Sequence, residues 1–193
     1  MASKKHFSTG FSLVEVLVSV VVLGVGLLGA MSLLLASART SSEAATFTAA
    51  VNLVRDLSEK ARMNHAIAQR NDASNGYLVE GWTEGAAPGS MGLSCIASNV
   101  ACDAAQLAAW DMREWQLRVA AALPDARASV CFDESPWSDA AGAYTWGCSG
   151  TGRSLVVKLG WTGRGADDAD KPASPRLVMQ MVPGQPQDGQ QGS

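Results

Sequence analysis

One acidic residue stands alone in a long apolar segment near the start of the chain. Between Phe11 and Ala38, 20 of the 28 residues are apolar, and Glu15 is the only charged residue among them. An ionised carboxylate inside hydrocarbon costs several kcal/mol unless a group of opposite charge pairs with it. Glu15 therefore indicates a partner of opposite charge for this segment.

The other residues that could do chemistry form no recognisable catalytic or metal-binding pattern. His6 and His65 each lack a Ser, Cys or carboxylate at a spacing that suggests catalysis. The acidic run Asp167–Asp170 lacks the D-x-D-x-D-G order and the later Glu of a calcium loop, which favours a solvated loop. The sequence therefore predicts no enzyme, no metal site and no cofactor.

The length and charge of the chain narrow its class. It has 193 residues, with 15 Lys and Arg against 18 Asp and Glu, and a net charge of −3. This balance argues against a nucleic-acid binder, which would normally carry a basic patch. Without residues 11–38 the composition is ordinary for a soluble globular domain. The chain is therefore expected to join one membrane-length segment to one water-soluble body.

The apolar segment is long enough to cross a membrane. Val16–Ala38 runs for 23 residues without a charge, and a helix needs about 20 apolar residues to cross the hydrocarbon core. Lys4 and Lys5 should stay in the cytoplasm, which places the body outside the inner membrane. A secretory signal peptide cut at Ala36–Ala38 is an alternative, although its core would be unusually long. A plain single-span anchor is another, but it leaves Glu15 unexplained.

The residues around Glu15 resemble a known processing signal. The stretch GFSLVEVLV, residues 10–18, closely resembles the type III signal of type IV pilins and type II secretion pseudopilins. The resemblance implies that a prepilin peptidase cuts after Gly10, the last leader residue, and methylates the new N-terminal residue, Phe11. It also implies that Glu15, the fifth residue of the mature chain, neutralises the terminal amine of a neighbouring subunit during filament assembly. Burial of either charge without that pairing would be costly, so the pair would also favour the correct alignment of neighbouring subunits.

A long helix is expected to contain and follow this segment. Its apolar residues beyond the span recur at spacings of four, three, three and four, which marks one helical face: Phe47, Val51, Val54, Leu57 and Ala61. The pattern predicts a helix over residues 11–69, followed by loop-forming residues at 71–76.

The remaining residues predict a small head of mixed structure. Residues 81–101 are rich in Gly, Ser and Ala and are expected to form an irregular connection. Asp103 should cap a helix that runs to about Leu123 and stops at Pro124. Its expected buried stripe comprises Met112, Trp115, Val119 and Ala122. Strands are expected at residues 155–161 and 177–182, which alternate with period two, and more weakly at 129–133 and 144–146.

The expected fold is therefore α+β and type IV pilin-like, with a long N-terminal helix packed on a small antiparallel sheet and an extra helix. The expected divisions are a leader at 1–10, a long helix at 11–70 whose residues 11–38 are transmembrane, a periplasmic head at 71–182 and a flexible tail at 183–193. All six tryptophans fall in the head, where core packing and contacts between subunits are commoner roles than sugar binding.

Four cysteines lie on the side of the membrane predicted to be oxidising. An even count in such a compartment indicates two disulfides, and the spacings do not provide the close ligand pairs of a zinc site. Of the three possible pairings we favour Cys95–Cys102 and Cys131–Cys148, because each closes a short loop. Loops of this size stabilise a fold by about 2–3 kcal/mol in the chain-entropy model.

The residues after the second cysteine resemble the head of PilV-class minor pilins. The order is CDAAQL at 102–107, then Trp110–Asp111, Trp115 and Leu123–Pro124. The resemblance covers about a third of the head. It implies a minor pilin that is built at low copy into the type IV pilus, belongs to a priming complex at the tip, and supports assembly, adhesion and twitching motility.

The resemblance also implies partners and leaves other functions open. The partners would be the prepilin peptidase, the other minor pilins, the major pilin and the inner membrane, with a tip adhesin as a further candidate and no nucleic acid. The alternative function is a minor pseudopilin of a type II secretion system, against which the two disulfides and the Trp-rich helix argue weakly. An anchored periplasmic enzyme or sugar-binding head is a third possibility, supported only by the tryptophans.

Overall fold

Two compact units make up the chain, and they divide between Ala44 and Ala45. The computed structural model describes residues 12–87, 95–96, 101–153, 155–163 and 173–181. The expected leader and tail lie outside these residues. Helix α1, Leu13–Met63, contributes to both units.

Helix α1 ends before the residue that the apolar periodicity predicts. It stops at Met63, and a short helix, α2, follows at His65–Ala68. Between them Asn64 has φ −115° and ψ 45°, and its side-chain amide donates a hydrogen bond to the Ala104 carbonyl oxygen over 2.7 Å. The expected unbroken helix to Gln69 is therefore wrong, because a contact with a residue 40 positions later favours a non-helical backbone at Asn64.

The capped helix in the head is confirmed. Helix α3 spans Ala104–Ala122 and begins with a capping box. The Asp103 carboxylate accepts a hydrogen bond from the Gln106 backbone N–H over 2.8 Å. In return, the Gln106 side-chain oxygen accepts one from the Asp103 backbone N–H over 3.0 Å. Three members of the expected stripe, Met112, Trp115 and Val119, are buried. Ala122 is exposed, which contradicts the prediction, and Leu123 at the helix end is buried instead.

A four-stranded antiparallel sheet forms the centre of the head. Its strands run in the order β1-β2-β5-β6, with bounds Val79–Thr83, Arg127–Phe132, Leu155–Gly160 and Leu177–Met181. A separate hairpin pairs β3, Trp137–Ser138, with β4, Ala143–Tyr144. The two strands that the alternating pattern predicts are confirmed as β5 and β6.

Strand β1 includes residues that the sequence analysis assigns to an irregular connection. Its register with β2 shifts between Val79 and Trp82, where Gly81 has φ +66°. The Gly81 N–H donates to the Ser129 hydroxyl oxygen over 3.0 Å instead of following the regular ladder. The glycine that indicated a loop therefore provides a bulge within a strand.

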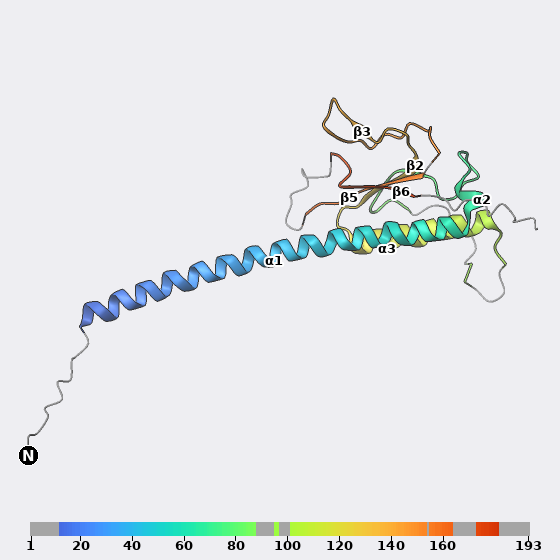
Figure 1. Cartoon of the computed structure of the whole chain (residues 1–193). Coiled ribbons are helices and arrows are strands. Elements are labelled where there is room, and N and C mark those ends of the chain that lie inside the picture. The colour runs from blue at the N-terminus through green and yellow to red at the C-terminus, as the bar shows by residue number, and fades with distance from the viewer. Residues whose placement is uncertain (1–11, 88–94, 97–100, 154, 164–172, 182–193) are drawn as a thin grey trace, which may run out of the picture. The chain divides into compact units, whose positions relative to one another are not determined.

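The second part of α1 and helix α3 pack together on one face of the sheet (Figure 1). Trp115 is fully buried there, and its indole N–H donates to the Leu53 carbonyl oxygen over 2.9 Å. Three residues of the predicted α1 face are buried: Val54, Leu57 and Ala61. Phe47 is 46% exposed, because at this position it contacts only the edge of the core, with its ring 6.2 Å from that of Trp161.

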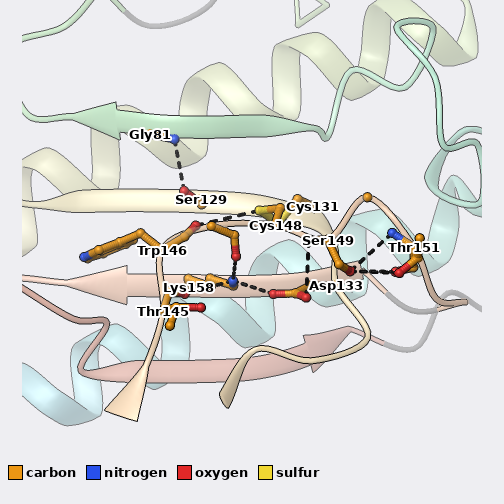
Figure 2. The surroundings of a disulfide bond; sticks show 12 residues. Gly81, Ser129, Cys131, Asp133, Thr145, Trp146, Cys148, Ser149, Thr151 and Lys158 are labelled. Atoms are coloured by element: carbon orange, nitrogen blue, oxygen red, sulfur yellow. Dashed lines mark hydrogen bonds and ion pairs between the residues drawn. A yellow bond between two sulfur atoms is a disulfide. The ribbon is translucent and has the colours of Figure 1, made fainter. Parts of the chain in front are cut away.

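The opposite face of the sheet is also covered. All six residues of β5 are buried, although their period-two pattern would fit a strand with one face in water. Leu155, Val157 and Leu159 belong to the core formed with the helices. Val156 and Lys158 lie between them in the strand and so belong to the opposite face of the sheet. Figure 2 shows the segment that includes Thr145 and Cys148 crossing over this outer face.

A buried ion pair lies beneath that segment. The Lys158 ammonium donates to the Asp133 carboxylate over 2.5 Å and to the carbonyl oxygens of Thr145 (2.9 Å) and Gly147 (2.5 Å). Neither side chain is more than 1% exposed. Because a buried charge without partners is costly, the carbonyl oxygens help to keep Lys158 inside the fold.

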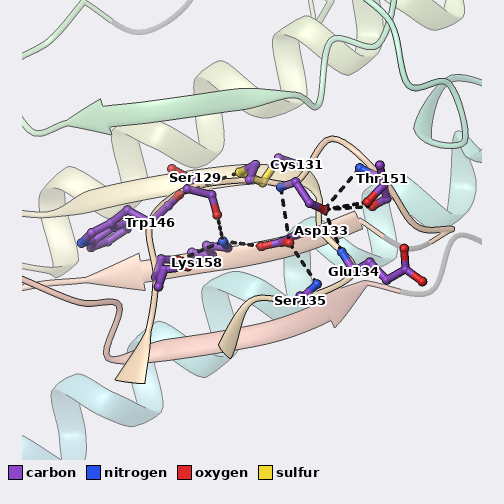
Figure 3. A network of polar contacts seen from close by, with 12 residues as sticks. Ser129, Cys131, Asp133, Glu134, Ser135, Trp146, Thr151 and Lys158 are labelled. Atoms are coloured by element: carbon purple, nitrogen blue, oxygen red, sulfur yellow. Dashed lines mark hydrogen bonds and ion pairs between the residues drawn. A yellow bond between two sulfur atoms is a disulfide. The ribbon is translucent and has the colours of Figure 1, made fainter. Parts of the chain in front are cut away.

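The pKa of Asp133 reflects two opposing effects. Burial alone would raise the pKa of this carboxyl group, but hydrogen bonds from Lys158, from the Ser135 backbone N–H and from Ser149 hold it below its usual value of 3.8. Figure 3 shows Lys158 and Ser135 directed at Asp133, while the neighbouring Glu134 carboxylate points away.

We predict that Gly76→Ala destabilises the head. A Cβ atom at position 76 would lie 2.7 Å from the Ala109 backbone nitrogen and 3.1 Å from the Ala108 carbonyl carbon, so α3 would have to move. Overpacking of this kind costs about 1–3 kcal/mol. Gly147→Ala is the control, because its Cβ would meet nothing within 4 Å. Thermal unfolding of the full chain in detergent should show a lower midpoint for Gly76→Ala alone; equal midpoints would contradict the close approach.

We also predict that acid destabilises the head through Asp133. Because the pKa of this carboxyl group is lower in the folded state than its ordinary 3.8, its stabilising effect is complete above pH 3.8 and is lost as the pH falls through the folded-state pKa. Denaturant titrations of wild type and Asp133→Asn between about pH 6 and pH 2.5 will test this. The variant should be less stable at about pH 6, and the difference in stability between the two proteins should narrow as the pH falls below 3.8. Parallel curves would exclude Asp133 as the cause.

Candidate functional site

The residues of the predicted processing signal lie at the start of α1. Gly10 and Phe11 fall outside the described residues, whose first is Ser12. The Ser12 carbonyl oxygen accepts hydrogen bonds from the backbone N–H groups of Glu15 (3.0 Å) and Val16 (3.2 Å) and so opens the helix. The helix therefore begins close after the expected cleavage point.

Glu15 occupies the first turn of α1 and is exposed. A carboxylate is favoured there, because the free N–H groups at a helix start carry partial positive charge. Among the described residues, no side chain forms an ion pair or hydrogen bond with its carboxylate. The neighbouring Ser19 hydroxyl donates to the Glu15 backbone carbonyl oxygen over 2.6 Å and leaves the carboxylate untouched. The side chain is therefore available to a cation outside the described chain.

The surface around Glu15 is apolar on every side of the helix. The large apolar side chains between Leu13 and Leu35 are all at least 51% exposed. Each would gain about 1.5–3 kcal/mol by leaving water. Among the described residues, α1 is the one helix long and apolar enough to cross a membrane, as judged by length and composition. This segment therefore needs lipid or other apolar helices around it.

Three hydroxyl groups of α1 are satisfied by the helix itself. The hydroxyls of Ser19, Ser32 and Thr40 donate to backbone carbonyl oxygens three or four residues earlier, at 2.6, 2.8 and 3.1 Å. Such internal bonds remove the cost of placing hydroxyl groups in hydrocarbon. Glu15 differs from them, because its charged group has no such internal partner in the described chain.

The cysteines lie in the second unit and are joined in the two pairs that the sequence analysis favours. Cys95 and Cys102 have Cα atoms 5.6 Å apart, directly before the cap of α3. Cys131 and Cys148 have Cα atoms 6.2 Å apart and connect β2 to the segment over the outer face of the sheet.

The other candidate residues from the sequence, which are the histidines, the acidic run and the tryptophans, do not form a common site in the described part of the chain. His65 lies in α2, whereas His6 and Asp167–Asp170 are outside the described residues. No group of three or more metal-ligating side chains occurs among the residues that the structure describes. Of the six tryptophans, Trp82, Trp115 and Trp161 are buried in the core, and Trp137 is 48% exposed.

Sequence reasoning missed the pair of Lys158 and Asp133. Two signals could have indicated it: a lysine inside an otherwise apolar strand, and an aspartate two residues after a cysteine of the same strand region. Neither signal identifies the partner, because the two residues are 25 positions apart.

Comparison with protein families identifies the N-terminal segment. Residues 6–31 match the family model described as the prokaryotic N-terminal methylation motif. No curated protein and no solved structure matches the chain. The motif supports a type IV pilin-like or pseudopilin protein, a structural class, and it implies processing by a prepilin peptidase and assembly with other pilins.

The fold agrees with this class. A long N-terminal apolar helix, a small antiparallel sheet and an extra helix form a type IV pilin-like α+β fold. The apolar helix and the motif are also consistent with anchoring in the inner membrane and association with a pilus.

Proposed function

We propose that the protein is a minor pilin of the type IV pilus, similar to the PilV class, and that it works in the priming or tip complex that supports pilus assembly, adhesion and twitching motility. It is made in the inner membrane, cut after Gly10 and methylated on Phe11. Its partners are the other minor pilins and the major pilin, with a tip adhesin as a further candidate.

One observation carries this proposal: an exposed carboxylate without a partner in the described chain lies within the matched methylation motif, on the first part of α1, which is otherwise apolar all round. Cleavage after Gly10 creates a positively charged amine on Phe11 and makes Glu15 the fifth residue of the mature chain. In an apolar environment the amine and the carboxylate each need an opposite charge. A neighbouring subunit's amine satisfies Glu15 without placing a further charge in the lipid.

The disulfides support an extracytoplasmic head. Both join cysteines of the second unit, and disulfides persist in oxidising compartments such as the periplasm. The head therefore lies in the periplasm before assembly, and Lys4 and Lys5 stay in the cytoplasm.

A minor pseudopilin of a type II secretion system is the second candidate, because the same motif serves that machine. The resemblance of the head to PilV-class minor pilins favours the pilus, and it rests on the two disulfides and on the Trp-rich helix after Cys102, which carries Trp110 and Trp115. Deleting the gene and measuring surface pili, twitching and secreted protein separates the two functions. Loss of secretion with normal pili would favour the pseudopilin.

Gly10→Val should block processing. The peptidase must bring its catalytic groups to the bond after residue 10, and a branched side chain there obstructs this approach. We expect a full-length membrane precursor that is absent from sheared pili, as N-terminal sequencing and an intact mass measurement would show. Thr9→Val is the matched control, because it places the same side chain one residue before the glycine and should be processed normally. Normal mature protein from Gly10→Val would contradict cleavage at this site.

Glu15→Ala should block assembly and leave both insertion and cleavage intact. Removing an intramembrane charge makes insertion at least as favourable, and the bond after Gly10 is unchanged. Without the carboxylate the neighbour's amine is buried unpaired, so incorporation into purified filaments should fall about tenfold or more. Glu15→Gln should fail similarly, because it keeps the shape without the charge.

Glu43→Ala is the matched control for this experiment. Glu43 is an exposed glutamate of the same helix that lies beyond the apolar segment, so its loss should leave incorporation unchanged. Quantitative immunoblots of sheared filaments and pull-downs of partner pilins measure the effect. Full incorporation of Glu15→Ala would refute the pairing, and so would an equal loss in Glu43→Ala.

A further inference from the structure

The segment over the outer face of the sheet is held at several points around one cysteine. We name residues 143–150 the cover segment; it begins with β4 and contains Cys148. Lys158 contacts it through the carbonyl oxygens of Thr145 and Gly147. Gly147 immediately precedes Cys148, so the lysine fixes the chain on the N-terminal side of that cysteine.

Asp133 fixes the chain on the other side. One oxygen of its carboxylate accepts from the backbone N–H of Ser149, the residue after Cys148, over 3.4 Å. The other oxygen accepts from Lys158. Asp133 itself follows Cys131 by two residues, at the end of β2. The ion pair therefore connects the surroundings of Cys131 to the peptide groups on both sides of Cys148.

We propose that the buried pair of Lys158 and Asp133 selects the partner of Cys148, by holding it beside Cys131 before the disulfide forms. Four cysteines allow three pairings, and loop-closure entropy favours Cys131 over the more distant Cys102 as the partner of Cys148 by only about fourfold. Non-covalent closure of the 17-residue separation raises the effective concentration of Cys148 at Cys131. The role concerns folding of the head and holds for a pilin and a pseudopilin alike.

The chemical step is an ordinary thiol–disulfide exchange with a disulfide oxidant. One cysteine thiolate attacks the oxidant and forms a mixed disulfide, and the second thiolate displaces the oxidant's sulfur. The two cysteines lose two electrons and two protons, and the oxidant's disulfide becomes two thiols. The ion pair takes no part in these bonds and acts only on the position of the cysteines.

The other disulfide provides an internal control. Cys95 and Cys102 lie at the start of α3, and none of the hydrogen bonds of Lys158 or Asp133 in the described structure involves them. A change in the ion pair should therefore affect one disulfide and spare the other.

The first test measures the equilibrium of each disulfide with glutathione. Full-length wild type and Lys158→Met, reduced and then equilibrated in detergent at several ratios of oxidised to reduced glutathione, are trapped with a maleimide and mapped by mass spectrometry. We expect the equilibrium constant of Cys131–Cys148 to fall about tenfold in the variant, since hydrogen bonds to charged groups are among the strongest, with mispaired species increased. The constant of Cys95–Cys102 should not change. An unchanged constant for Cys131–Cys148 would overturn the proposal.

A second variant separates positioning from general loss of stability. Val157→Ala removes core volume from the same strand on the face that packs on the helices, and it leaves the ion pair intact. It should lower the thermal midpoint without changing the pairing of Cys148. If Val157→Ala redistributes the pairings as much as Lys158→Met does, stability explains the effect and the proposal is wrong.

A third measurement asks whether the ion pair acts before the disulfide exists. In the variant Cys131→Ser/Cys148→Ser the cover segment should remain in place, so hydrogen exchange at the Ser149 amide should stay slow. Adding Lys158→Met to that background should make this exchange fast. Fast exchange already in the double-serine protein would show that the disulfide holds the segment, and this would refute the proposal.

Discussion

The head depends on apolar burial between one face of its sheet and two helices. Trp115 is the centre of this contact, because its ring is fully buried while its N–H group reaches the Leu53 carbonyl oxygen of α1. A large ring with its polar atom satisfied contributes area without leaving an unpaired donor. The pairs Lys60–Asp111 and Arg118–Asp56 lie at the edge of the same contact and align α3 with α1. The order of the strands then brings β2 and β5 to the middle of the covered face.

Covering the outer face of the sheet creates a different problem. Lys158 on β5 would lie in water on an ordinary two-layer fold, yet it is inside the protein. Its charge is balanced by Asp133, and its remaining donors are used by carbonyl oxygens of the cover segment. The covalent bond Cys131–Cys148 and the ion pair therefore hold the same segment in two different ways. The polar contacts are directional, so they specify position more sharply than apolar burial does.

In the first unit, unlike the head, the apolar side chains are exposed. A helix with this surface is stable only among lipids or other apolar helices, and three of its hydroxyl groups bond within the helix, which suits such surroundings. Glu15 alone departs from the pattern. In a chain that carries the methylation motif, a carboxylate at this position gives an otherwise uniform apolar surface one point of electrostatic specificity.

The features that can be predicted from the sequence are those with local causes. The uninterrupted apolar run specifies the first part of α1, the reciprocal contact of Asp103 and Gln106 specifies the start of α3, and alternation specifies β5. Tertiary structure alone decided the break at Asn64, whose amide bonds to Ala104, and the bulged strand at Gly81, whose N–H bonds to Ser129. It also decided that Lys158 is buried with Asp133. Each of these depends on a partner 25 or more residues away, and no local pattern contains the position of a distant partner.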